Sequence, residues 1–273
     1  SRFFNSRKEQ RRVMPRCRSL IVDGIVYICA FCHRFLMVFL VLLGVCRGAS
    51  PGDTLQVASS DGSGSVVGVW WGSSDSASVS GSKRNASPVA VWFHGGMTSS
   101  NCKKGLEAGS DLAELLPGFT VISASACKER HWAIPSAVEW IDAALDSVAS
   151  RRKSPVENVY LLGISDGAIG TFVYSAQGKR KVVARTVISS YGAMLGAAQN
   201  LGKMQEFKSG KWLFIQGGSD RLYPSQETVP WIEAFCKTLG KECELKYDPK
   251  GEHDWSYWKN SRKDWILKLF KEK

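Results

Sequence analysis

The sequence predicts an α/β fold in which a mostly parallel central sheet carries helices on both faces. From residue 88 onward, short apolar runs alternate with segments of helical periodicity. The apolar runs are continuous rather than alternately apolar and polar, which is typical of strands buried on both faces of a parallel sheet. The segments between these runs are short, so we expect no large cap domain.

Each expected element follows from a local pattern. Residues 54–58 and 65–71 are β-like and flank an Asp61-Gly62 turn signal, which predicts an opening antiparallel hairpin. The continuous apolar runs predict strands over 89–93, 119–123, 159–163, 182–189, 212–216 and 243–247. Helical spacing of apolar residues predicts helices over 104–116, 136–150, the residues after 165, 228–239 and 254–270.

Residues 1–49 have the features of a targeting segment. Basic residues precede a charge-free apolar run of twelve residues, 35–46, and small residues follow it. This run matches a signal peptide and is shorter than the roughly 20 residues that cross a bilayer. Residues 20–32 are also largely apolar, so an uncleaved membrane anchor stays open. We therefore expect a secreted, periplasmic or membrane-anchored protein whose main domain comprises residues 50–273.

The formal net charge of +11 does not favour a nucleic-acid partner, because most of it lies in the targeting segment. Residues 1–49 hold nine Lys or Arg against Glu9 and Asp23, which leaves a net charge of +4 for residues 50–273. A domain this mildly basic lacks the electrostatic footprint of a nucleic-acid-binding protein.

Four of the eight cysteines lie in residues 50–273, and an even number in an exported chain permits two disulfides. Cys102 and Cys127 each follow a predicted strand, whereas Cys236 and Cys243 flank a helix-to-strand turn. We expect the pairs 102–127 and 236–243, with four free thiols as the alternative. The cysteine spacings do not resemble a zinc site.

The segment GISDG, residues 163–167, predicts a nucleophile at Ser165. It lies between an apolar strand and a helix, which is the context that the G-x-S-x-G motif requires. Small residues at 163 and 167 let strand and helix approach each other around a sharp turn. The helix N-terminus then places backbone N–H dipoles where negative charge develops.

A serine hydroxyl needs a neighbouring base, and His253 is the predicted one. It lies in a loop between the last predicted strand and the last helix, where the imidazole can reach the sheet edge. His131, in another loop, is the competing histidine. Asp220 follows the strand 212–216 directly and is predicted to orient the base, whereas the adjacent Asp254 is expected to point elsewhere.

The HGGM segment at the end of strand 89–93 supplies the expected oxyanion hole. Acyl transfer places negative charge on the carbonyl oxygen, and unhindered backbone N–H groups can stabilise that charge. The first donor is expected to be Gly96 or Met97, and the second is Asp166, which follows the nucleophile. The Asp166 side chain is expected to place a carboxylate at the mouth of the site.

HGG after a strand, GISDG, GGSDRLYP and GEHDW together resemble the signature segments of the α/β-hydrolase superfamily. The chain order Ser165, Asp220, His253 is also that of its triads. The last two segments are similar to those of dienelactone hydrolase-like and phospholipase/carboxylesterase-type esterases, and more loosely to the prolyl oligopeptidase catalytic domain. HGG followed by Met97 departs from the hormone-sensitive lipase pattern.

This resemblance implies that residues 50–273 form the catalytic domain of a serine esterase without cofactor or metal. The substrate is expected to be a small-molecule or polymer-borne carboxylic ester, cleaved through an acyl-enzyme. A serine peptidase or acyltransferase with the same triad is the near alternative, and a non-catalytic binding protein of the same fold is the distant one. The N-terminal segment adds a possible membrane tether.

Overall fold

The computed structural model describes residues 52–76, 86–96, 102–126 and 132–271. The expected targeting segment, Met97, Cys127 and His131 lie outside these ranges, so the predictions on them stay predictions. Among the described helices, none combines the length and the apolarity needed to cross a membrane.

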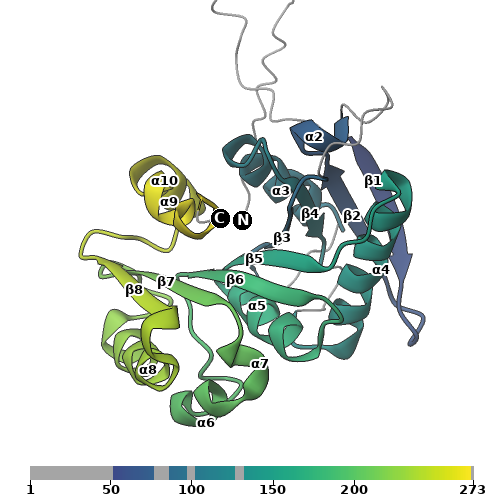
Figure 1. The fold of residues 1–273 in the computed structure, drawn as a ribbon. Helices are drawn as coiled ribbons and strands as arrows, with labels where there is room; N and C mark the ends of the chain where they lie inside the picture. Colours follow the sequence, from purple (N-terminus) through teal and green to yellow (C-terminus); the bar gives the residue numbers. More distant parts are fainter. Residues whose placement is uncertain (1–51, 77–85, 97–101, 127–131, 272–273) are drawn as a thin grey trace, which may run out of the picture. The chain divides into compact units, whose positions relative to one another are not determined.

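A sheet of eight strands forms the centre of the described part of the chain (Figure 1). Its order is β1-β2-β4-β3-β5-β6-β7-β8; β2 runs antiparallel to both of its neighbours, and the other pairs are parallel. The predicted opening hairpin and mostly parallel sheet are therefore confirmed. The strands are β1 (Asp53–Ala58), β2 (Gly64–Trp70), β3 (Val89–Phe93), β4 (Thr120–Ala124), β5 (Asn158–Ile164), β6 (Lys181–Ile188), β7 (Lys211–Gly217) and β8 (Cys243–Asp248).

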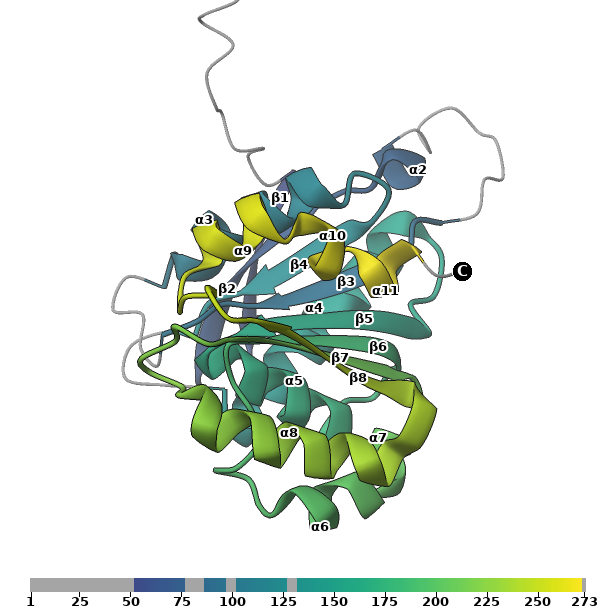
Figure 2. The ribbon, with the colours of Figure 1, turned by 90° about the vertical axis from the view of Figure 1, so that its left-hand side faces the viewer.

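Helices cover both faces of the sheet, as predicted (Figure 2). One face carries α3 (Lys104–Leu115), α9 (Trp255–Ser261), α10 (Lys263–Ile266) and α11 (Lys268–Lys271). The other carries α4 (Pro135–Arg152), α5 (Asp166–Gln177), α6 (Ala198–Lys203), α7 (Gln205–Lys208) and α8 (Ser225–Leu239). Two further short elements are α2 (Ser73–Ser76) and the 3-10 helix η2 (Gly240–Glu242).

Strand β3 shows why the strands are continuously apolar in sequence. Val91 and Phe93 pack into the core on the α4 and α5 side, whereas Ala90 and Trp92 pack on the α3 and α9 side. Successive side chains of a strand point to opposite faces of the sheet. Because both faces are covered by helices, every position of β3 is buried.

The C-terminal segment differs from its prediction, because the expected helix over 254–270 is divided into α9, α10 and α11. The first interruption is Arg262, whose backbone leaves the helical region at φ −137° and ψ 34°. Its guanidinium pairs with the Asp248 carboxylate at 2.7 Å and lies over the Trp265 ring. These contacts hold the chain in a bend that the helical periodicity does not reveal.

The connection from β6 to β7 also differs, because it contains the short helices α6 and α7, which the sequence did not predict. These are the only regular elements in this connection, all of whose residues are described. They pack against the sheet-covering α5 and α8. In the described part of the chain, no separate cap domain is inserted here.

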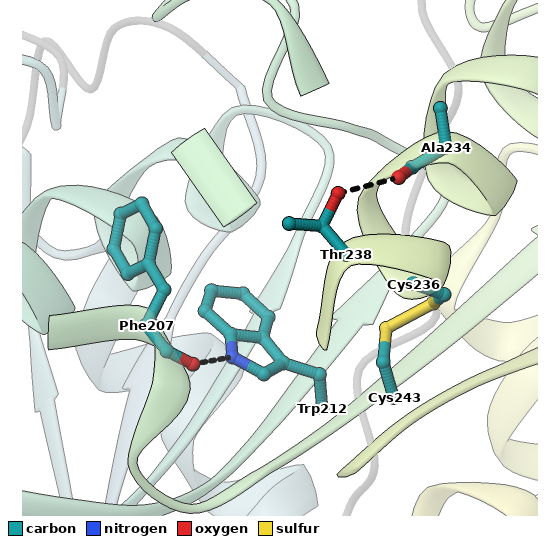
Figure 3. The surroundings of a disulfide bond; sticks show 6 residues. All are labelled: Phe207, Trp212, Ala234, Cys236, Thr238 and Cys243. Atoms are coloured by element: carbon teal, nitrogen blue, oxygen red, sulfur yellow. Dashed lines mark hydrogen bonds between the residues drawn. A yellow bond between two sulfur atoms is a disulfide. The ribbon is translucent and has the colours of Figure 1, made fainter. Parts of the chain in front are cut away.

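A disulfide between Cys236 and Cys243 joins the end of α8 to the start of β8 (Figure 3). The two Cα atoms are 4.9 Å apart, and the pairing is the one predicted from the sequence. Nearby, the Thr238 hydroxyl donates to the Ala234 carbonyl oxygen within α8. Cys102 is disulfide-bonded as well, but its predicted partner lies outside the described residues.

Candidate active site

Ser165 lies at a sharp turn between β5 and α5 with φ 56° and ψ −124°. A positive φ is unfavourable for a residue with a side chain, so the surrounding structure must hold this conformation. The flanking glycines permit the turn. A Cβ on Gly163 would lie 2.2 Å from the Gly167 carbonyl oxygen, and one on Gly167 would lie 2.0 Å from that of Phe93.

The structure brings Ser165, His253 and Asp220 into one hydrogen-bonded chain. The His253 Nε2 atom lies 2.9 Å from the Ser165 Oγ atom, and its Nδ1 atom lies 2.9 Å from an Asp220 carboxylate oxygen. A carboxylate only accepts, so Nδ1 carries the proton and Nε2 is left to accept from the serine hydroxyl. This is the arrangement that a general base requires.

The Asp220 carboxylate is held in place by contacts other than its hydrogen bond to the imidazole. Its side chain is buried, and its second oxygen accepts hydrogen bonds from the backbone N–H groups of Leu222 and Tyr223, at 2.9 and 2.8 Å. Hydrogen bonds from backbone donors stabilise the ionised form of a carboxyl group. Asp220 therefore presents one defined oxygen to His253.

The loops that carry Asp220 and His253 are joined to each other by their backbones. The Ser219 N–H donates to the Gly251 carbonyl oxygen at 3.0 Å. A Cβ on Gly217 would lie 2.2 Å from that same oxygen, so only glycine allows the loops to come this close. The acid and the base thus share one support at the carboxyl ends of β7 and β8.

The predicted oxyanion loop lies directly against the nucleophile. A Cβ on Gly95 would be 3.2 Å from the Ser165 Cβ atom, and Gly96 takes the left-handed conformation at φ 84°. Asp166 is the first residue of α5, where backbone N–H groups have no intrahelical acceptor. Gly96 and Asp166 thus both lie next to Ser165, whereas Met97, the other predicted donor, is outside the described residues.

The Asp166 side chain corrects one expectation. It was expected at the mouth of the site, but the residue is only 5% exposed and faces the interior. Because it begins a helix, its charge lies at the favourable end of the helix dipole. Asp166 is also absent from the described residues that line the pocket beside Ser165.

His94 holds the oxyanion loop, a role that the sequence analysis did not assign. Its Nδ1 atom bonds the Gly95 carbonyl oxygen and its Nε2 atom accepts from the Ala126 N–H, both at 3.0 Å. Burial, with a smaller contribution from the nearby Lys104 ammonium, lowers the pKa of His94 to about 4. The imidazole is therefore neutral at pH 7 and can donate through one nitrogen while accepting through the other. The HGG motif, which contains His94, was the sequence signal from which this role could have been predicted.

A pocket of about 450 Å³ opens beside Ser165, between α3 and α9. The rings of Trp92 and Trp255 meet in its wall with centroids 4.8 Å apart. Trp255 also packs against the apolar core on this face of the sheet, so it belongs both to the core and to the pocket wall. The described residues that line the pocket are Trp92, His94, Gly95, Gly96, Lys104, Glu107, Ala108, Asp111, Ile164, Ser165, His253, Asp254 and Trp255.

Helices α3 and α9 are joined by contacts of Asp111, one of the residues that line this pocket. The Asp111 carboxylate accepts from the Trp255 indole N–H at 3.0 Å and pairs with the Lys259 ammonium at 2.6 Å. The pocket wall is thus built by segments that are far apart in the chain. Within the described residues, no group of three or more His, Cys, Asp or Glu side chains is placed to hold a metal ion.

Comparison with known proteins adds evidence from structure alone. No protein-family model matches the chain, and no curated protein matches it in sequence. S-formylglutathione hydrolase from Staphylococcus aureus matches with a TM-score of 0.58 at 17% identity, over 80% of this chain and 97% of that one. A ferulic acid esterase matches with a TM-score of 0.56 at 15% identity, over 76% and 92%.

An esterase from Pyrococcus furiosus has the same arrangement, with a TM-score of 0.54 at 12% identity over 80% of this chain and 92% of that one. The strand order, the helical layers and these similar structures all indicate the same fold. The chain has the α/β-hydrolase fold. In an α/β-hydrolase fold the carboxyl ends of the parallel strands form one edge of the sheet, and Gly96, Ser165, Asp220 and His253 all follow strands that end there.

Proposed function

We propose that the protein is a serine hydrolase that cleaves a carboxylic ester through an acyl-enzyme. Ser165 is the nucleophile, His253 the general base and Asp220 the carboxylate that orients the base. The observation that carries this proposal is the unbroken hydrogen-bonded path from Asp220 through His253 to Ser165, with both bonds at 2.9 Å. The open pocket beside the hydroxyl gives a substrate access to it.

In the proposed reaction, the Ser165 oxygen attacks the ester carbonyl carbon while its proton moves to the Nε2 atom of His253. The π electrons of the carbonyl move to its oxygen and form an oxyanion. When this intermediate collapses, the bond to the alcohol oxygen breaks and the imidazolium gives that oxygen its proton. Water, deprotonated by the same imidazole, then releases the acid and restores the Ser165 hydroxyl.

The oxyanion requires donors on the side of Ser165 that faces the Gly95 loop. Backbone N–H groups of Gly96 and Asp166 are the proposed pair, with Met97 as the alternative first donor from the sequence. The strained turn at Ser165 and the neutral His94 support this arrangement, because they fix the nucleophile and the loop relative to each other.

Ester cleavage is proposed ahead of the alternatives because several of the similar structures are esterases. A structure described as a putative dipeptidyl aminopeptidase IV from Bacteroides ovatus also matches, with a TM-score of 0.58, but over only 35% of that chain. The peptidase alternative therefore merits a direct comparison of ester and amide substrates.

A fluorophosphonate probe tests the proposal, because it labels only activated serines. We expect the full chain to be labelled and to hydrolyse short p-nitrophenyl esters, and Ser165→Ala to lose both properties. Ser219→Ala is the matched control, because this hydroxyl lies next to Asp220 in the chain and, among the described residues, donates to the Pro249 carbonyl oxygen and not to the proposed triad. Unchanged labelling in Ser165→Ala would refute the assignment, and faster cleavage of aminoacyl p-nitroanilides than of esters would favour the peptidase.

A further inference from the structure

Lys104 is a cation in the wall of the pocket that the proposed triad does not use. It is the first residue of α3 and lines the same pocket as Ser165 and His253. Its ammonium nitrogen lies beside the oxyanion loop, because a Cβ on Gly96 would come within 2.1 Å of it. The side chain thus reaches the part of the site where negative charge would develop.

This lysine lies at the unfavourable end of its helix. Helix N-termini carry partial positive charge and favour Asp or Glu, yet α3 begins with Lys103 as N-cap and Lys104 as its first residue. The Lys103 side chain makes no capping hydrogen bond; the Ser125 hydroxyl accepts from the Gly105 N–H at 3.0 Å, and Glu107 is an acidic residue of the first turn. A residue that goes against such a local preference, as a lysine does at a helix N-terminus, is expected at a functional site.

Lys104 also lacks a counter-charge in the structure. Among the described residues, no carboxylate forms an ion pair with it. The carboxylates nearest to it in the pocket have other tasks or surroundings: Asp111 pairs with Lys259, Asp254 accepts from a backbone N–H at the start of α9, and Glu107 is exposed. A cation placed at this loop without a partner points to an anion that is present only during the reaction.

We propose that Lys104 belongs to the oxyanion site and stabilises the tetrahedral intermediate together with the backbone N–H groups of Gly96 and Asp166. This inference rests on the proposed function. The ammonium transfers no proton: it stays charged and faces the oxygen that receives the carbonyl electrons when Ser165 attacks. Electrostatic stabilisation of this kind acts on the transition state more than on the neutral substrate.

The lowered pKa of His94 indicates that the Lys104 charge acts on the oxyanion loop. The Lys104 ammonium contributes to the lowered pKa of His94, whose imidazole bonds the Gly95 carbonyl oxygen. The field of the ammonium therefore extends over the loop that would hold the oxyanion. The N-terminus of α5, which starts at Asp166, adds positive potential next to the nucleophile.

Lys104→Met in the full chain tests the proposal with p-nitrophenyl butyrate and with phenylboronic acid, which forms an anionic tetrahedral adduct with an activated serine. We expect kcat to fall roughly 10- to 100-fold and KM to change by less than about threefold, since an oxyanion donor acts mainly in the transition state. The inhibition constant of the boronic acid should rise in parallel with the loss of kcat/KM. Lys104→Arg should retain most of the activity.

Lys103→Met is the matched control, because it removes the same charge from the exposed neighbouring position outside the pocket. We expect its kcat to stay within about twofold of the wild type, since the charge is removed from a position that solvent screens. Lys104→Met should also unfold at the same temperature as the wild type or a higher one, because it removes a cation from a helix N-terminus. A merely structural lysine would not combine unimpaired stability with a loss of kcat.

Two results would overturn this inference while leaving the proposed function intact. One is an active wild type whose kcat is unchanged in Lys104→Met. The other is a loss restricted to KM and to esters whose acyl group carries a free carboxylate, tested with the p-nitrophenyl monoester of glutaric acid. By contrast, a wild type that neither hydrolyses esters nor takes up the fluorophosphonate probe would defeat the proposed function itself.

Discussion

The phenol ring of Tyr223 stacks on the imidazole of His253, with ring centroids 5.4 Å apart and planes inclined by 12°. The backbone N–H of the same tyrosine donates to the Asp220 carboxylate at 2.8 Å. One residue therefore fixes the acid through its backbone and the base through its ring. Tyr191 meets the Tyr223 ring edge-on, with centroids 6.1 Å apart, and supports it from the side.

Removing this ring should slow the reaction without dismantling the triad. In Tyr223→Leu the backbone bond to Asp220 persists, but the imidazole loses a stacked partner worth about 0.5–1.5 kcal/mol. If that energy holds His253 in its productive orientation, kcat falls by about two- to tenfold. Steady-state kinetics on a p-nitrophenyl ester measures the effect, and Tyr223→Phe should stay near the wild type. Equal activity of the leucine and phenylalanine variants would show that stacking does not position the base.

Asp220→Asn should be far more damaging than its small change in shape suggests. The Asn amide oxygen would keep the backbone bonds from Leu222 and Tyr223, which leaves its NH₂ group facing Nδ1 of His253. Nδ1 must then accept, so the proton moves to Nε2, which can no longer accept from Ser165. We expect kcat to fall by about 10³–10⁴-fold.

The matched control for Asp220→Asn is Asp142→Asn. Asp142 is also buried and hydrogen-bonded, but its partners are the Tyr174 hydroxyl and the Lys179 N–H on the far side of the sheet. This control should lose stability in a denaturant titration and keep its kcat. A similar loss of kcat in both variants would mean that disturbed folding, rather than the tautomer of His253, explains the effect.

The nucleophile turn should not tolerate a single added methyl group. In Gly167→Ala the new Cβ would lie 2.0 Å from the Phe93 carbonyl oxygen, so β3 and α5 must separate. Such overpacking costs roughly 1–3 kcal/mol or more, and it displaces the oxyanion loop that follows β3. We expect a lower urea midpoint and little fluorophosphonate labelling. Gly118→Ala, where the added Cβ meets nothing within 4 Å, should match the wild type in both measurements.

The sheet and the meeting of Ser165, His253 and Asp220 were predictable because they depend on local patterns. A continuous apolar strand followed by a glycine-flanked Ser165 specifies both the element and the turn, and the residues after β7 and β8 reach the same sheet edge whatever their sequence separation. The bond from His253 to Ser165 spans 88 positions in the chain. It follows from strand order, which the alternation of strands and helices largely determines.

The pocket was not predictable in the same way, because its wall depends on packing between elements distant in sequence. Asp111 on α3 accepts a hydrogen bond from Trp255 on α9, 144 positions away in the sequence, and no local pattern predicts that contact. Buried Arg185 is another example, since it lies in a mostly apolar strand. It is satisfied by the Ser175 hydroxyl and by carbonyl oxygens of the α7 segment, and it lies over the Trp212 ring. Only the assembled fold supplies these partners.

The buried His94 should make stability depend on pH in a defined window. Burial lowers its pKa from 6.5 to about 4, so between these values the unfolded chain binds a proton that the folded protein does not. The free energy of unfolding therefore falls as pH drops from about 6.5 to about 4, by up to ~3 kcal/mol from this group. Above pH 6.5 the imidazole is neutral in both states and the contribution is fully present.

Urea titrations of the wild type and of His94→Gln between pH 4 and 7 isolate this contribution, because the glutamine side chain does not titrate. The variant should be less stable than the wild type at pH 7, since one amide cannot reproduce both bonds at the required geometry, to the Gly95 carbonyl oxygen and the Ala126 N–H. The stability difference should shrink as the pH falls, because the wild type alone loses the contribution of the neutral imidazole. Parallel pH profiles for the two proteins would mean that folding does not shift the pKa of His94, and the donor and acceptor roles that hold the oxyanion loop would then have to be reassigned.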